Sequence, residues 1–250
     1  MKKLKALDLF CGAGGAGMGL HRAGFDVIGV DIVHQPRYPF MFLRGDALKT
    51  QFGLSKFDLV WANPPCQAHT SMKTMHNALP HKDLIPETRA MLKAAGVPYV
   101  IENVVGAPLE NPFMLCGTMF GLEVDGAELH RHRIFETNFP VPAMKCMHRD
   151  RPVIGVYGGH VRNRRRRPGS KSRGVEDFSI EQAQKAMQID WMTLTEMCQA
   201  IPPAFSAYIA VSAVLSGAVG PTAEALIARS IGEAIHSGDL PIKVTKTGAR

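Results

Sequence analysis

The chain lacks the features that mark disulfide-stabilised, secreted or membrane-spanning proteins. Five cysteines occur in 250 residues, an odd number with no regular spacing, which argues against a disulfide framework and fits a reducing cytosol. After Met1 and two lysines the sequence enters a predicted strand, with no apolar signal segment. The longest apolar stretch, 204–219, is interrupted by serines and predicts a buried helix that is too short to span a membrane.

Acidic residues are in the minority. The chain has 29 Lys and Arg against 22 Asp and Glu, a formal net charge of +7 and a pI near 9.3. This balance favours a polyanionic partner. A length of 250 residues suffices for a sizeable core in one or two domains.

Cys66 stands in the most informative segment of the chain. The apolar run 59–62 predicts a buried strand, which Asn63-Pro64-Pro65 ends abruptly. Prolines restrict their own φ angles and bias the preceding residue toward extended backbone. The segment therefore predicts a thiol on a stiff loop at a strand end, where open α/β sheets bind ligands.

A glycine-rich turn near the N-terminus gives a second, independent signal. Residues 5–10 predict a strand, 11–17 a glycine-rich turn and 18–23 a helix, and a second strand at 25–31 ends in Asp31. Glycine permits a tight turn and close backbone approach to a ligand, and a helix N-terminus offers free N–H groups. Asp31 is placed to accept hydrogen bonds from a ribose diol. A glycine-rich turn without a ligand is the alternative.

These segments together resemble the DNA cytosine-5 methyltransferases, in particular compact enzymes of the phage and bacterial orphan type. The matching motifs occur in family order, and they are Asp8-Leu-Phe-Cys-Gly-Ala-Gly-Gly15, Asn63-Pro-Pro-Cys-Gln67, Ile101-Glu-Asn-Val104, Arg131-His-Arg133 and Gln199-Ala-Ile-Pro-Pro-Ala204. The resemblance implies methyl transfer from S-adenosylmethionine to carbon 5 of cytosine in double-stranded DNA, through a covalent cysteine adduct and a flipped base. It also implies a cytoplasmic protein of a bacterial or phage-infected cell.

The resemblance assigns the catalytic roles to four residues. Cys66 is the expected nucleophile, because a thiolate at carbon 6 of the ring activates carbon 5. Glu102 is expected at ring nitrogen 3, where charge develops. Arg133 is expected to reach the base carbonyl, and Arg131 to support a phosphate or the loop.

The cofactor is expected at the glycine turn and the neighbouring strand ends. A third strand is predicted at 41–46, and in the family an acid at its end contacts the adenine amino group; a surface turn is the alternative. The implied contacts are Asp8, Phe10, Cys11, Gly12, Gly14, Gly15, Asp31, Ile32, Asp46, Ala47, Asn63 and Pro64.

Alternating strands and helices up to about residue 137 predict an α/β, doubly wound, mostly parallel sheet of the Rossmann-like methyltransferase type. A helix is predicted at 81–96 and a buried strand at 97–104. We expect a catalytic and cofactor-binding domain at 1–137, a reduced target-recognition region at 138–175, and C-terminal helices at 176–250 that complete the catalytic domain.

The expected contacts to DNA lie after the nucleophile and in a basic arm. An arginine cluster with Gly, Ser and Pro at 160–173 cannot bury itself, which predicts a flexible phosphate-binding arm. Because phosphate contacts carry little sequence information, a short recognition sequence is expected. The residues assigned to DNA are Gln67, Ser71, Arg162, Arg164, Arg165, Arg166 and Arg167.

Two departures from the family pattern stand out. Leu129 occupies the place of a glutamine usual before the arginine motif, and the closing motif at 199–203 lacks its usual asparagine. A contact near the amino-acid end of the cofactor is therefore in doubt. RNA or a free nucleotide as substrate, and a catalytically silent nucleic-acid binder, remain alternatives; a nicotinamide oxidoreductase would leave Cys66 without a role.

No metal site is predicted. Cys146-Met-His148 and the nearby His160 suggest zinc, but their spacing matches no standard motif and no fourth ligand is evident. Cys116 and Cys198 are expected to be packing residues. Isoleucines at helical spacing within 222–236 predict a last helix that docks on the domain or forms a dimer contact. A monomer is favoured over a weak homodimer.

Overall fold

A seven-stranded sheet forms the centre of the computed structural model, which describes residues 3–50, 53–69, 82–163 and 177–219. The strand order is β3-β2-β1-β4-β5-β9-β6. Strands β1 to β5 are parallel, whereas β9 runs antiparallel to both of its neighbours. The strands are β1 (Lys5–Leu9), β2 (Asp26–Asp31), β3 (Met41–Arg44), β4 (Leu59–Ala62), β5 (Tyr99–Asn103), β6 (Phe113–Leu115) and β9 (Arg133–Thr137). The prediction of a doubly wound, mostly parallel sheet is confirmed.

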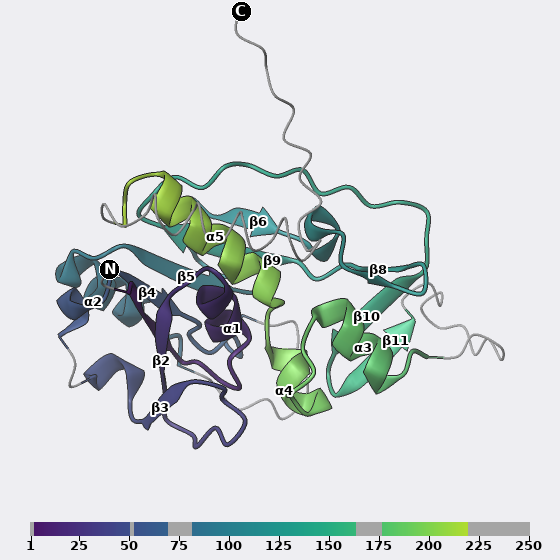
Figure 1. Ribbon diagram of the computed structural model, residues 1–250, viewed down its shortest axis with the longest axis horizontal. Helices are drawn as coiled ribbons and strands as arrows, with labels where there is room; N and C mark the ends of the chain where they lie inside the picture. The colour runs from purple at the N-terminus through teal and green to yellow at the C-terminus, as the bar shows by residue number, and fades with distance from the viewer. Residues whose placement is uncertain (1–2, 51–52, 70–81, 164–176, 220–250) are drawn as a thin grey trace, which may run out of the picture.

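Helices cover both faces of this sheet (Figure 1). Helix α1 (Gly15–Arg22) packs against α5 (Pro203–Leu215), and both contribute to the hydrophobic cluster on one face. Helix α2 (Ile85–Ala95) contributes Ile85 and Leu92 to the cluster on the other face. Burial on both faces explains why the central strands are near-continuous apolar runs rather than alternating ones.

Close contact between α1 and α5 depends on glycine. A β-carbon at Gly19 would lie 2.1 Å from the carbonyl oxygen of Pro203. The Ser206 hydroxyl donates to the Ala16 carbonyl at 2.8 Å across the same interface. Helix α5 therefore packs directly on α1, the helix that follows the glycine turn.

A second, four-stranded sheet lies beside the first, with α3 next to it (Figure 1). Its order is β11-β10-β8-β7. The elements of this part are β7 (Glu123–Val124), β8 (Ala127–Leu129), β10 (Val153–Tyr157), β11 (His160–Asn163), α3 (Ile180–Met187) and α4 (Leu194–Gln199). Two of its strands precede residue 137 and two follow it, so the sheet draws on both sides of the predicted domain boundary. The three-part division of the chain stays a prediction.

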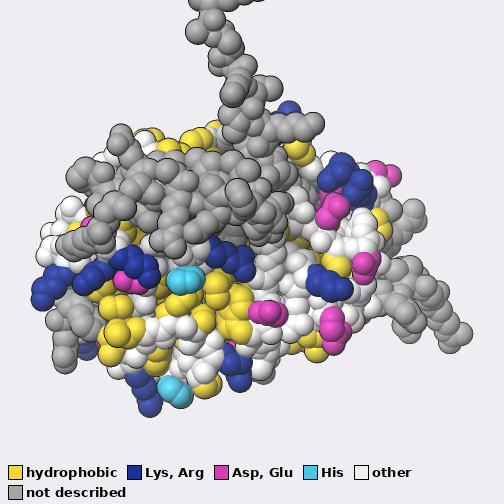
Figure 2. All heavy atoms as spheres, in the orientation of Figure 1, with side chains coloured by type: hydrophobic (Ala, Val, Ile, Leu, Met, Phe, Trp, Pro, Cys, Tyr) yellow, Lys and Arg dark blue, Asp and Glu magenta, His cyan; other side chains and the backbone are white. Residues whose placement is uncertain are grey.

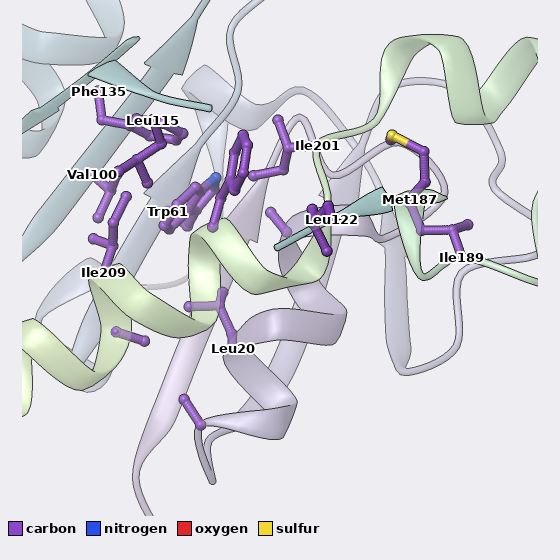
Figure 3. Close-up of a cluster of buried hydrophobic side chains, with 14 of the residues drawn as sticks. Leu20, Trp61, Val100, Leu115, Leu122, Phe135, Met187, Ile189, Ile201 and Ile209 are labelled. Carbon is purple, nitrogen blue, oxygen red and sulfur yellow. The ribbon is translucent and has the colours of Figure 1, made fainter. Parts of the chain in front are cut away.

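The two sheets share one hydrophobic core (Figure 3). Trp61 and Phe135, from the first sheet, are fully buried with ring centroids 5.9 Å apart. Leu122 beside β7 and Met187 of α3 belong to the same cluster. Because this cluster is continuous, the second sheet is held against the first by apolar burial.

Most predicted elements occur, with shifted ends. Helix α2 begins at Ile85 rather than at 81, since Pro86 suits a first turn. Within the described ranges, no helix has the length and apolar character needed to cross a bilayer. The helix predicted at 222–236 lies outside the described residues.

Candidate functional site

The nucleophile loop is tied to the neighbouring strand. Strand β4 is buried throughout and ends at Ala62, and Cys66 follows four residues later, half-buried. The side-chain amide of Asn103, at the end of β5, donates to the Pro64 carbonyl at 3.0 Å. The loop is thus stiffened by its prolines and anchored by Asn103, a residue for which the sequence analysis proposed no role.

Glu102 and Arg133 meet across the β5–β9 pair. Glu102 is 8% exposed, and its Oε1 lies 3.0 Å from Nε of Arg133. Arg133 also donates to the His132 carbonyl at 2.8 Å. The antiparallel entry of β9 next to β5 brings these two predicted catalytic residues together.

Cys66, Glu102 and Arg133 influence one another electrostatically. Burial and the Glu102 charge raise the pKa of the Cys66 thiol, whereas Arg133 and Arg131 lower it. Burial also raises the pKa of Glu102, and the same two arginines oppose that shift. A pKa perturbed by burial and by specific charged partners is typical of a functional site. The arrangement places a carboxyl group and two guanidinium groups near enough to a thiol to act on its charge.

Arg131 has a different environment from Arg133. It is 6% exposed and donates to the carbonyls of Val156 at 2.6 Å and Cys198 at 2.8 Å, and also to the carbonyl of Ala200. These contacts join β10 to the end of α4 and to the residue that follows it. The guanidinium of Arg131 is therefore enclosed by protein, and its part in the reaction stays a prediction.

The glycine turn has the backbone that a ligand-binding loop needs. Phe10, Gly12 and Gly14 have φ angles of 54°, 49° and 91°, and for Phe10 such a conformation is strained. A β-carbon at Gly12 would have no atom within 4 Å. The Gly12 N–H donates to Asp31 Oδ2 at 3.0 Å, and Val33 N–H donates to Oδ1 at 2.9 Å. Hydrogen bonds to Asp31 thus hold the glycine turn and the end of β2 together.

Three of the predicted cofactor residues, Asp8, Cys11 and Gly15, are buried. Asp8 is fully buried and accepts hydrogen bonds from the Tyr38 hydroxyl at 3.1 Å and from Asn63 Nδ2 at 3.4 Å. A β-carbon at Gly15 would lie 2.6 Å from the Ile201 carbonyl. Burial and the charges of Asp8 and Asp31 raise the pKa of Cys11. The assignment of Asp8, Cys11 and Gly15 to the cofactor stays a prediction.

Two shallow pockets adjoin the carboxyl ends of β2 and β3. Asp46 lines both, and Ile32 lines the larger, of about 530 Å³. The Leu48 N–H donates to Asp46 Oδ1 at 3.0 Å, while Ala47 is buried. Two predicted cofactor contacts, Ile32 and Asp46, thus line the larger pocket, and their role stays a prediction.

The expected DNA-binding residues are only partly described. Gln67 and Arg162 are exposed, the latter on β11. Ser71 and Arg164 to Arg167, and most of the predicted arm, lie outside the described residues. In Figure 2, Lys and Arg side chains form separate groups with Asp and Glu among them on the visible face.

Tyr38 is a further residue that the sequence analysis missed. Its ring lies against Gly29 of β2, where a β-carbon would be 2.4 Å from the ring, and its hydroxyl reaches Asp8.

The Gly158-Gly159 pair was missed as well. Both residues have positive φ, as a two-residue hairpin turn between β10 and β11 requires.

Comparison with known proteins agrees with the fold of this chain. The S. pombe Dnmt2 methyltransferase superposes with a TM-score of 0.53 at 12% identity, over 85% of this chain and 98% of that one. The Entamoeba histolytica methyltransferase EhMeth superposes with a TM-score of 0.53 at 12% identity, over 84% of this chain and 97% of that one. The type II methyltransferase M.XorII of Xanthomonas oryzae pv. oryzae is 29% identical over 122 residues.

The resemblance to the cytosine-5 methyltransferase family is confirmed. The fold is the α/β Rossmann-like fold of the S-adenosylmethionine-dependent methyltransferases, and the family uses that cofactor. The match to M.XorII covers 40% of this chain and 28% of that protein's length. No protein-family model matches the chain.

Proposed function

We propose that the chain transfers a methyl group from S-adenosylmethionine to carbon 5 of cytosine in DNA. The observation that carries the proposal is the convergence of a half-buried thiol, Cys66, with buried Glu102 and its half-buried partner Arg133 at neighbouring strand ends. Nucleophile, acid and guanidinium are the three groups that this chemistry requires of the protein.

Each group has a defined task in this reaction. The Cys66 thiolate bonds to carbon 6 of the ring, and the displaced electron pair is delocalised toward carbon 5 and nitrogen 3. Protonated Glu102 donates a hydrogen bond at nitrogen 3, and Arg133 holds the ring carbonyl. Carbon 5 would take the methyl group as the bond from that group to the sulfonium sulfur breaks, which leaves a neutral thioether. The proton on carbon 5 would then pass to solvent water, and the bond between the Cys66 sulfur and carbon 6 would break and restore the thiolate.

The glycine turn, Asp31, Ile32 and Asp46 would hold the cofactor, which supplies an electrophilic methyl on a sulfonium. Asp31 would accept hydrogen bonds from the ribose, and Asp46 from the adenine amino group. Asn63 and Pro64 lie between this site and Cys66 along the chain. The same loop would therefore carry both cofactor contacts and the nucleophile.

A nucleic-acid substrate is supported by the net charge of +7 and by the basic segment at 160–173. A ring within a duplex hides carbon 6, so the target nucleotide must be flipped out, at a cost of a few kcal/mol. A short target sequence is proposed, because the segment 138–175, where base recognition is expected, is short.

The test measures transfer of the tritiated methyl group from labelled S-adenosylmethionine to duplex DNA, tRNA and dCMP. We expect label in DNA alone, in 5-methylcytosine, and a stable covalent complex with DNA that contains 5-fluorocytosine. Cys66→Ser should abolish both, while Cys198→Ser, which alters a cysteine outside the site, should keep both.

Each contrary outcome has a clear meaning. Label in tRNA or dCMP but not in DNA would show that the substrate is RNA or a free nucleotide instead of DNA. Binding of DNA without transfer or trapping would identify a catalytically silent binder. Full methyl transfer by Cys66→Ser would exclude Cys66 as the nucleophile and with it the proposed mechanism.

A further inference from the structure

Four metal-ligating side chains meet outside the proposed active site. They are Cys116, His132, Cys146 and His148, and one ligand atom from each lies within 4.8 Å of the other three. Among the described residues this is the one group of that kind. His160, which the sequence placed with Cys146 and His148, is on β11 and does not belong to it.

We propose that these four side chains form a structural zinc site. The zinc–ligand bond lengths of tetrahedral sites imply sulfur–nitrogen separations of about 3.5 Å. The Nε2 atom of His148 lies 3.3 Å from Sγ of Cys116 and 2.9 Å from Sγ of Cys146, and His132 Nε2 lies 3.6 Å from the Cys146 sulfur. Two thiolates and two imidazoles are a ligand set that selects zinc.

Neighbouring groups are placed to orient these ligands. The Thr118 hydroxyl donates to the Cys116 sulfur at 3.4 Å and lies 3.7 Å from that of Cys146. The His148 ring stacks on His130 with centroids 3.7 Å apart, and His130 Nε2 is 3.0 Å from a Glu128 carboxylate oxygen. Outer partners of this type fix the orientation of metal ligands and adjust their basicity.

The chain positions of the ligands define what the metal would do. Cys116 follows β6, His132 precedes β9, and Cys146 and His148 lie on the connection from β9 to β10. A bound zinc would therefore clamp this connection, which leads into the second sheet, to the edge of the first. Four protein ligands leave no open position, as in structural rather than catalytic sites.

The site would also act on the active-site arginines. His132 stands between Arg131 and Arg133, and its carbonyl accepts the hydrogen bond from Arg133. Fixing the His132 backbone would thus fix the arginine that pairs with Glu102. His132 is a positioning residue in this scheme. The proposal does not depend on the methyl-transfer reaction, because metal content is measured without it.

The test measures metal in the full chain purified without a metal-binding tag. Elemental analysis should find roughly one zinc per chain. Cys146→Ser and His148→Ala should lose most of it, whereas His160→Ala and Cys198→Ser should retain it. His148 is exposed, so its replacement should leave the fold intact.

A second measurement avoids the variants. Wild-type protein stripped of metal and reconstituted with Co²⁺ should show the ligand-field and thiolate charge-transfer absorption of a tetrahedral site. A chelator should lower the wild-type Tm by several degrees and leave the Tm of Cys146→Ser unchanged. Absence of both zinc and the cobalt spectrum, zinc retained in Cys146→Ser and His148→Ala, or a Cys116–Cys146 disulfide in the purified protein would each overturn the proposal.

Discussion

At the scale of the residue, Cys66 and Glu102 affect each other's proton affinity. Burial and the Glu102 charge place the pKa of the free thiol above its ordinary value. Thiolate therefore forms only at higher pH than for an exposed cysteine. A neutral group at position 102 would leave the two arginines as the main charges near the sulfur.

Glu102→Gln is accordingly expected to lower the pKa of Cys66. The pH profile of Cys66 alkylation by iodoacetamide, followed by mass spectrometry of its peptide, should move to lower pH. Glu181→Gln, at an exposed site on α3, should leave the profile unchanged. An unchanged or upward-shifted profile in Glu102→Gln would show that Glu102 does not act on the thiol.

Gly15 illustrates a residue whose role is set by packing. A β-carbon there would meet the Ile201 backbone carbonyl at 2.6 Å, and backbone cannot turn aside as a side chain can. Gly15→Ala should lower the free energy of unfolding by about 1–3 kcal/mol, and should weaken binding of S-adenosylmethionine.

The matched control is Gly53→Ala, where the nearest atom would be 3.8 Å away. Urea unfolding should give this variant a stability close to that of the wild type. Equal stability of the two variants would mean that the turn and the closing motif can separate without cost.

At the scale of the element, Arg131 joins three parts of the chain. Its guanidinium donates to carbonyls of β10, of the end of α4 and of Ala200, while Arg133, two residues later, lies beside Glu102. The two arginines of the motif thus have separate surroundings, one among backbone carbonyls and one beside a carboxylate.

Arg131→Met should be strongly destabilising, by about 3–5 kcal/mol, because it leaves buried carbonyl acceptors without a charged donor. Denaturant unfolding measures this directly. Arg162→Met, at an exposed position on β11, should change stability little. A small effect of Arg131→Met would indicate that the second sheet is held by apolar packing alone.

At the scale of the whole molecule, excess positive charge governs association with a polyanion. Each phosphate contact contributes about 0.9 to the slope of log affinity against log salt for duplex DNA. Replacing Arg164 to Arg167 with serine should reduce the magnitude of that slope by up to about 3.6, if all four contact phosphate.

Fluorescence anisotropy with labelled duplexes over a series of salt concentrations measures the slope. Lys185→Ser is the control, because it also replaces a positive charge with a serine, but at an exposed site on α3 outside the arm. A slope unaffected by the four replacements would exclude the arm from the interface.

Local motifs account for what the sequence alone determined. The Asn63-Pro-Pro stop after a buried run and the glycine turn between strand and helix depend on short-range φ preferences and on apolar periodicity. The parallel strands β1 to β5 and the turn carrying Gly12 and Gly14 therefore occur as predicted.

Only the tertiary structure decided how distant segments meet. The insertion of β9 between β5 and β6 pairs Glu102 with Arg133, and the second sheet combines strands on either side of residue 137. The same long-range packing gathers Cys116 and His132 with Cys146 and His148. Such pairings leave no local pattern in the sequence, because side chains far apart along the chain meet only once the core that the sheets share has formed.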